Sequence, residues 1–281
     1  MPNETLKIFE TELAELSQKT TPFAWASTKN NLGHAFVALS LDQSNYDGLK
    51  QSVKEIEDKL EDCNMKDSRE EWLALQTELS ATLHTLGQRE PVNKVSNFNS
   101  AMEAYKALLP AITRQESPLE WATMLHNIAG VFQGLGEHSD GARSLERSIS
   151  AYNNALMVRT PDDHPMEWAL TQNNAAVSMQ LLGMIKQDGD ILNEAIKSYA
   201  NAQQKLKQAD MPLAWFITTS NLGTAQLILA EETKDIDIAR QAVNNFNDIV
   251  EFLHDASNSQ HLEFATQFQE KALAVLAQLG G

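Results

Sequence analysis

Residues 118–136 read PLEWATMLHNIAGVFQGLG, and residues 165–183 repeat that phrase as PMEWALTQNNAAVSMQLLG. The tryptophan of this phrase recurs in steps of 47, 49, 47 and 47 residues. All five tryptophans of the chain take part, and they are Trp25, Trp72, Trp121, Trp168 and Trp215. Internal repeats with a period of roughly 20 to 50 residues are typical of stacked supersecondary units rather than of one closed globule. The spacing therefore predicts five similar units, each with its tryptophan in the core.

Each unit opens with signals for an α-helix. Proline follows residues 21, 117, 164 and 211, which places it in a first helical turn, where no N–H donor is needed. The second unit lacks this proline, and Ser68 with Glu71 predicts a capping box there, as Ser117 with Glu120 does in the third unit. Apolar residues follow each tryptophan after seven and fourteen positions, on one side of an amphipathic helix. First helices are thus predicted to start near residues 22, 68, 117, 164 and 211.

A second helix is predicted to complete each unit. Leu-Gly pairs at residues 86–87, 135–136 and 182–183 predict the ends of first helices, because glycine is common just past a helix C-terminus. A second apolar pattern then begins, with Leu145 and Tyr152 in one unit and Leu192 and Tyr199 at matching positions in the next. Each unit is therefore expected to be a pair of packed helices.

The two ends of the chain fit the same scheme. Residues 3–19 carry an apolar stripe and are predicted to form a lone capping helix. Residues 262–266 resemble residues 119–123, so residues 259–279 are predicted to form a closing first helix without a partner. Terminal helices that differ from the rest keep a stack of repeats soluble. The prediction is a single all-α repeat domain over residues 1–281, with about twelve helices.

Three phrases carry a resemblance to a known family. Ala195, Tyr199 and Ala202 form an Ala-x-x-x-Tyr-x-x-Ala phrase, and the strings at residues 30–33 and 220–223 end in Asn-Leu-Gly. The chain resembles, over essentially its whole length, the tetratricopeptide-repeat family in its long bacterial or kinesin-light-chain-like variants. The resemblance implies a right-handed superhelical α-solenoid whose first helices line a concave groove for a peptide. The 47-residue period exceeds the usual unit of about 34 residues, which implies helices longer by one or two turns.

A candidate groove face is predicted from the helical periodicity. Positions two, six, nine and thirteen after each tryptophan share one side of a helix. Position six holds Asn31, Glu78, Asn127, Asn174 and Asn221. An asparagine amide both donates and accepts hydrogen bonds, so a row of asparagines can pair with the main chain of an extended ligand. The alternative is that each asparagine bonds to the neighbouring helix and contacts no ligand.

The same face becomes apolar in the fourth and fifth units. Its residues there include Leu170, Val177, Leu181 and Ile217, with Ile228 at the far end of the last stretch. An exposed cluster of this kind predicts a hydrophobic anchor for the ligand. The alternative is a tighter superhelical curvature that buries these side chains.

The charge distribution limits the class of partner. Acidic residues outnumber basic ones by 38 to 22, and the formal net charge is −16. Nucleic acid is an unexpected partner for such a chain, because phosphate binding relies on clustered lysine and arginine. From each tryptophan to the fourteenth residue after it, Lys29 is the only basic residue, so the groove should not hold acidic peptide tails. The expected partner is a neutral or basic protein or peptide.

Neither catalytic nor targeting signals stand out. The histidines fall on different faces of equivalent helices, and Glu251 with His254 is a lone Glu-x-x-His spacing. The acidic run at residues 55–62 should raise the pKa of the single cysteine, Cys63. We therefore expect no enzymatic activity, cofactor or metal. The first residues lack a basic segment followed by an apolar one, and no apolar run approaches the roughly 20 residues that span a bilayer, so a cytoplasmic protein is expected.

Three functions are compatible with these features. The first is a cytoplasmic adaptor or scaffold that binds a partner segment in the groove. The second is a regulator in which a short signal peptide shifts a conformational equilibrium. The third is a structural protein that self-associates through the last helix, at Phe264, Phe268 and Leu276.

Overall fold

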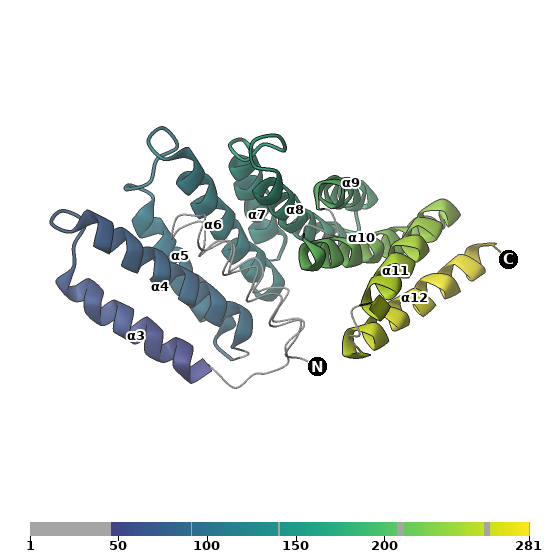
Figure 1. Cartoon of the computed structure of the whole chain (residues 1–281), viewed down its shortest axis with the longest axis horizontal. Helices are drawn as coiled ribbons and strands as arrows, with labels where there is room; N and C mark the ends of the chain where they lie inside the picture. Colours follow the sequence, from purple (N-terminus) through teal and green to yellow (C-terminus); the bar gives the residue numbers. More distant parts are fainter. Residues whose placement is uncertain (1–45, 91, 140, 207–210, 256–258, 281) are drawn as a thin grey trace. The chain divides into compact units, whose positions relative to one another are not determined.

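The computed structural model describes residues 46–90, 92–139, 141–206, 211–255 and 259–280. Within these ranges the chain forms ten α-helices and no β-strand, which confirms the all-α class predicted from the repeat (Figure 1). The expected capping helix at residues 3–19, the first helix near residue 22 and the candidate residue Asn31 lie outside the described ranges.

The helices divide between two compact units, with the boundary between Thr160 and Pro161. The N-terminal unit contains α3 (Tyr46–Asp62), α4 (Arg69–Arg89), α5 (Lys94–Leu108), α6 (Pro118–His138) and α7 (Ala142–Leu156). The C-terminal unit contains α8 (Pro165–Lys186), α9 (Gly189–Lys205), α10 (Pro212–Thr233), α11 (Ile236–Asp255) and α12 (Ser259–Gly280).

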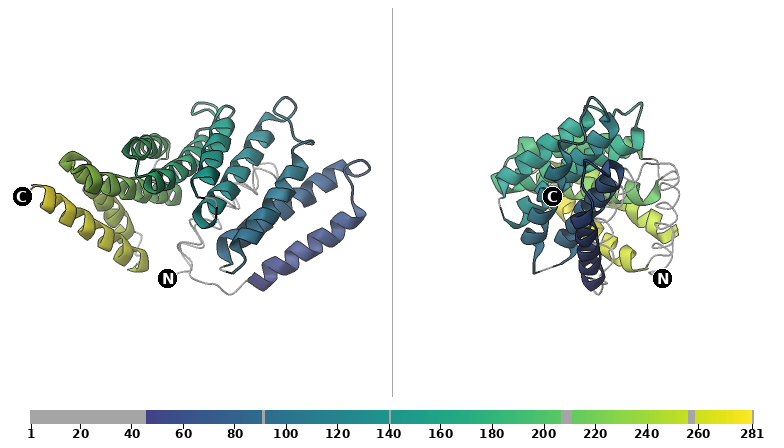
Figure 2. Two further views of the ribbon diagram at one scale, coloured as in Figure 1. Left: turned by 180° about the vertical axis from the view of Figure 1, so that it is seen from behind. Right: turned by 90° about the vertical axis from the view of Figure 1, so that its left-hand side faces the viewer.

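The packing alternates in the same way within each unit. First helices pack on their own second helices in antiparallel pairs, α4 with α5 and α6 with α7 in one unit, α8 with α9 and α10 with α11 in the other (Figures 1 and 2). Within a unit, a second helix also contacts the first helix that follows it, as α5 contacts α6 and α9 contacts α10. Consecutive first helices of the same unit also contact each other, α4 with α6 in one unit and α8 with α10 in the other.

The first helices begin where the sequence places them, but the two expected capping boxes do not form. Ser68 and Ser117 are the N-cap residues of α4 and α6, and neither side chain makes a capping hydrogen bond. A capping box requires the N-cap N–H to be accepted by the glutamate three residues later. Here the N–H of Ser68 is donated to the carbonyl of Asn64 (3.1 Å) and that of Ser117 to the carbonyl of Thr113 (3.0 Å). The backbone before each helix therefore takes the donor that Glu71 or Glu120 would need.

The prediction that Leu-Gly pairs end the first helices is wrong. Helix α4 continues to Arg89, α6 to His138 and α8 to Lys186, so all three glycines lie inside helices. A Cβ atom added at any of these glycines would overlap a side chain of the second helix. The distances would be 2.6 Å to Phe98 Cδ1 from Gly87, 2.6 Å to Leu145 Cγ from Gly136 and 2.9 Å to Leu192 Cγ from Gly183. These glycines let a second helix bring a large side chain against the first helix. In the last full pair the same two positions hold Ala230 and Ala239, both fully buried.

In the four helix pairs that are fully described, the centre is an aromatic residue of the second helix rather than the tryptophan. Tyr105, Tyr152, Tyr199 and Phe246 occupy equivalent positions and are almost completely buried. The tryptophans of the described units are only half-buried and pack at the edges of the core clusters. The tryptophans therefore pack against the core as expected, but at its edge.

Candidate functional site

The predicted groove positions of α8 and α10 form a half-buried face in the C-terminal unit. We call this the α8–α10 face, and it consists of Leu170, Asn174, Val177 and Leu181 of α8 with Ile217, Asn221, Thr224 and Ile228 of α10. Each of these residues keeps part of its surface exposed. Since α8 and α10 are in contact, the candidate residues of both helices belong to one structural unit.

The α8–α10 face carries no charge. No Asp, Glu, Lys or Arg occurs between Trp168 and Leu182 or between Trp215 and Leu229. Acidic residues stand at the ends of these helices, with Glu167 in the first turn of α8 and the exposed Glu231 in the last turns of α10. The face is thus a neutral strip with acidic residues beyond it.

Two of the candidate asparagines are linked through a third one. Nδ2 of Asn221 donates a hydrogen bond to Oδ1 of Asn173 (3.3 Å), across the boundary between α10 and α8. Nδ2 of Asn173 in turn donates to Oδ1 of Asn174 (3.0 Å). Bonding to a neighbouring helix, the alternative considered for these asparagines, therefore occurs at Asn221. That bond uses one of the two Nδ2 hydrogens of Asn221, and its Oδ1 accepts no hydrogen bond from any described residue.

The apolar residues of the face are likewise shared between packing and solvent. Leu170 packs against a buried cluster that includes Leu206 and Ala214. Val177 packs against the cluster around Tyr199 and Leu222. These contacts hold the two side chains in place while part of each stays exposed, which is the arrangement that an anchoring surface needs.

The equivalent positions of α6, in the N-terminal unit, are all buried. Thr123, Asn127, Gly130 and Gly134 occupy them, and Asn127 is only 1% exposed. A Cβ atom at Gly130 would lie 2.7 Å from His84 Cε1, and one at Gly134 would overlap the ring of Phe98. Neighbouring side chains thus fill the space in front of this part of α6. The Asn127 amide is enclosed there, and neither its Nδ2 nor its Oδ1 has a hydrogen-bond partner among the described residues.

A buried arginine binds the polar side chains near Asn127. Arg159 is 4% exposed, and its Nη2 donates to Thr123 Oγ1 at 2.7 Å. Its Nη1 lies 3.2 Å from Nδ1 of His126. Because a guanidinium can only donate, Nδ1 of His126 must accept, and the ring therefore carries its proton on Nε2.

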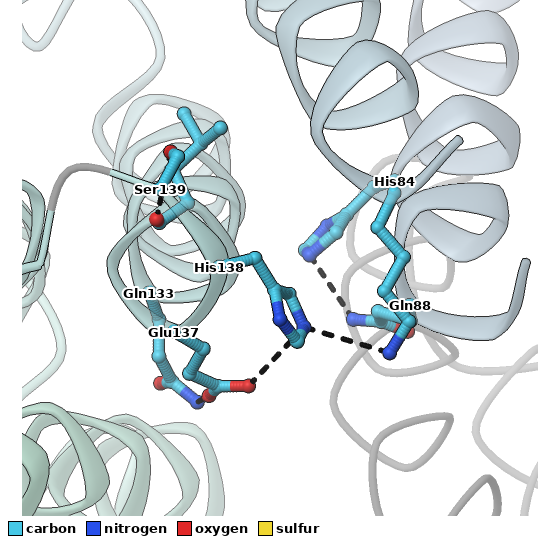
Figure 3. Close-up of polar contacts among 8 residues, drawn as sticks. His84, Gln88, Gln133, Glu137, His138 and Ser139 are labelled. Atoms are coloured by element: carbon cyan, nitrogen blue, oxygen red, sulfur yellow. Dashed lines mark hydrogen bonds and ion pairs between the residues drawn. The ribbon is translucent and has the colours of Figure 1, made fainter. Parts of the chain in front are cut away.

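His84 of α4 and His138 of α6 (Figure 3) both lie against the ring of Phe98, an arrangement that the sequence patterns did not indicate. The ring centroids lie 5.8 Å apart for His84 and Phe98 and 6.5 Å apart for His138 and Phe98. His84 is buried beside Gln88, and Nε2 of His138 lies 3.5 Å from Lys94 Nζ. Among the described residues, no group of three or more His, Cys, Asp or Glu side chains is arranged to hold a metal ion. What the structure shows for both histidines is ring contact with Phe98.

The lone cysteine lies in an environment that opposes thiolate formation. Cys63 is buried, and its Sγ lies 3.9 Å from the carbonyl oxygen of Ser68. Burial raises the pKa of the Cys63 thiol, and the nearby carboxylate of Glu71 raises it further. The direction agrees with the prediction, but burial rather than the acidic run at residues 55–62 is the main cause. A thiol with a raised pKa is a weak nucleophile.

The last helix uses one of its predicted self-association residues internally. The ring of Phe268 in α12 lies 5.6 Å from that of Phe246 in α11, so Phe268 belongs to the packing between these helices. Leu276 is half-buried, and the side chain of Phe264 lies outside the described part of the chain. Leu273 of α12 is an exposed large apolar residue, at 46%.

Neither comparison with known proteins assigns the chain to a family. No protein-family model matches it, and a search of curated proteins found no match. In the described part of the chain, no helix combines the length and apolar character required to cross a membrane.

Proposed function

We propose that this chain is a non-enzymatic scaffold or adaptor that binds an extended peptide segment of a partner protein. In this proposal the helix pairs continue as a right-handed, tetratricopeptide-like solenoid, and the first helices line its inner side. The observation that carries the proposal is the α8–α10 face, which combines half-buried asparagine amides with half-buried apolar side chains and no charge. Amides can hold a peptide main chain, while the apolar residues hold its side chains.

The chemistry of the face specifies the kind of segment. Apolar, uncharged side chains suit the central strip, because a charged side chain would lose water there without gaining an opposite charge. Basic residues suit the flanks of the segment, since Glu167, Glu231 and Glu232 lie at the helix ends and the chain has a net charge of −16. Acidic peptide tails are poor candidates, because the strip offers no lysine or arginine to a carboxylate.

The experiment selects ligands from a random peptide library on the full chain and measures their affinity by fluorescence anisotropy. We expect the selected peptides to be apolar at the centre, poor in Asp and Glu and basic at one or both ends. The variants Leu181→Asp and Ile217→Asp each place a carboxylate on the strip and should weaken binding about tenfold or more, as expected for a residue at the centre of an interface.

The matched control is Leu273→Asp, which makes the same chemical change at an exposed position of α12. It should leave peptide affinity unchanged, and circular dichroism should show that all three variants remain helical. If the selected peptides are acidic, or if the control weakens binding as much as Leu181→Asp does, the α8–α10 face is not the binding site.

A further inference from the structure

Asn173 occupies a position that the groove pattern does not include, five residues after the tryptophan rather than six. It is 6% exposed, so it presents almost no surface to a ligand. Both polar atoms of its side chain are nevertheless used, and both face candidate binding residues. Oδ1 accepts from Asn221 of the next helix pair, and Nδ2 donates to Asn174 of its own helix.

We infer that Asn173 is a positioning residue, which orients the amides of Asn221 and Asn174 on the α8–α10 face. The role of this orientation in ligand binding rests on the proposed function, but the orientation itself can be tested without a ligand. An amide group is planar, with Nδ2 and Oδ1 on opposite sides of its carbon atom. When Nδ2 of Asn221 donates to Asn173, Oδ1 of Asn221 therefore points away from Asn173. Asn221 then offers Oδ1 as an acceptor and one remaining N–H as a donor.

That pair of groups is complementary to a peptide main chain. A peptide unit presents one N–H and one carbonyl oxygen, which Oδ1 and the remaining Nδ2 hydrogen of Asn221 can engage. An amide that is held before binding loses less rotational freedom when the ligand arrives. Asn173 is well suited to hold it, since its own burial shields the bridging hydrogen bonds from competing water.

In the N-terminal unit, position five holds other residues and the asparagine bridge does not form. His126 occupies it in α6, and its ring lies against Tyr152, with centroids 5.1 Å apart, while Nδ1 faces Arg159. The side chain of its neighbour Asn127 has no hydrogen-bond partner in the part of the chain that the structure describes. In α4 the two positions hold Thr77 and the exposed Glu78. Among the described units, the bridge therefore depends on an asparagine at position five of one pair and another at position six of the next pair.

Selective ¹⁵N labelling of asparagine in the full chain tests the inference. In Asn173→Ala, the side-chain NH₂ resonances of Asn221 and Asn174 should shift, and exchange of the Asn221 Nδ2 hydrogens should become about fivefold faster, as expected from the loss of a hydrogen bond of about 1 kcal/mol. Asn173→Thr places at this position the residue found at Thr77, and should have the same effect if the alanine variant does not fold. Asn173→Asp keeps the acceptor for Asn221 and loses the donor to Asn174, so the Asn174 resonances should move while exchange of the Asn221 Nδ2 hydrogens should not become faster.

Ser220→Ala is the matched control. Ser220 occupies position five of α10, and its hydroxyl donates to the carbonyl of Phe216 within its own helix at 2.8 Å. Its removal should leave the resonances of Asn174 and Asn221 nearly unchanged. Unchanged Asn221 resonances in both Asn173→Ala and Asn173→Thr would overturn the positioning role.

The affinity of the selected peptide separates this inference from the proposed function. If both hold, Asn173→Ala should weaken the peptide about fivefold, through the loss of a fixed Asn221, while Ser220→Ala should not. If the resonances move but neither Asn173→Ala nor Asn221→Ala affects the peptide, Asn173 positions the amides and the binding site lies elsewhere. If Asn221→Ala weakens the peptide while Asn173→Ala does not, the site stands and the positioning role is refuted.

Discussion

Substitution of Gly136 by alanine tests whether a first-helix glycine is needed where a large side chain of the second helix packs closely against it. The new Cβ atom would lie 2.6 Å from Leu145 Cγ and 2.8 Å from Leu145 Cδ2, well inside ordinary contact, and 3.3 Å from the carbonyl oxygen of Gly141. Overpacking of this kind costs about 1–3 kcal/mol. Alanine is favoured over glycine inside a helix by about 1 kcal/mol, which offsets part of the loss. We therefore expect Gly136→Ala to lower the free energy of unfolding by up to about 2 kcal/mol.

Two further glycines make this a graded series. The nearest atom to an added Cβ is 2.9 Å away at Gly183 and 3.5 Å away at Gly189. Gly183→Ala should therefore destabilise less than Gly136→Ala, and Gly189→Ala should be neutral or slightly stabilising. Leu145→Ala in the Gly136→Ala background recreates the pair found at Ala230 and Ala239. The double variant should therefore lose less free energy of unfolding than the two single variants lose together.

Urea unfolding followed by circular dichroism measures each free energy. The reasoning is refuted if all three glycine variants gain stability, as helix propensity alone requires, or if their order does not match the order of the distances. It is also refuted if the effects of Gly136→Ala and Leu145→Ala add to within about 0.5 kcal/mol, because side chains that compete for one space must be coupled.

Three further substitutions probe other contacts. A hydrogen bond from Lys50 (2.6 Å) lowers the pKa of Glu90 below its usual value of 4.5. The ionised Glu90 therefore stabilises the fold above pH 4.5, and this stabilisation is lost as the pH falls through the folded-state pKa of Glu90. Glu90→Gln should therefore lower the melting temperature at about pH 6 but much less at about pH 3, and an equal effect at both would contradict this role. Tyr199→Phe removes the hydrogen bond from the Tyr199 hydroxyl to Gln180 Oε1 (2.9 Å) and should cost about 0.5–1.5 kcal/mol in urea unfolding. The ring itself should still fit, since Phe246 fills the equivalent site. A cost above about 3 kcal/mol would indicate that the hydroxyl contributes more than this one hydrogen bond. Trp168→Ala should cost about 2–3 kcal/mol, less than the 3–5 kcal/mol of a fully buried aromatic residue, and a loss below about 1 kcal/mol would count against its packing at the core edge.

The sequence was sufficient for the starts of the described first helices and insufficient for their ends. Proline in the first turn is a local signal, and α6, α8 and α10 each begin with it. Glycine is ambiguous, because it serves both as a C-cap and as a site of close approach. Gln187 and Lys234, in left-handed conformations with φ of 52° and 59°, come directly after the last residues of α8 and α10. Their side chains give no local signal for that conformation.

The candidate face was predictable in outline and not in detail. Position counting placed Asn174 and Asn221 on one side of successive first helices, and both are half-buried there. It did not identify Asn173, because position five differs from unit to unit and holds Thr77 in one and His126 in another. Only the distances between α8 and α10 show that Asn173 bridges the two candidate asparagines.

The sequence by itself determined the all-α class, the period of the helix pairs and the absence of charge along the candidate positions of the fourth and fifth units, because these properties depend on residue order within one unit. The tertiary structure decided which copies of the candidate face remain accessible. The side chains of His84 and Phe98 fill the space over Gly130 and Gly134 in α6, whereas Val177 and Leu181 keep part of their surface exposed at the same positions of α8. Burial depends on the size of the side chains that neighbouring helices contribute, and those residues lie far away in the sequence.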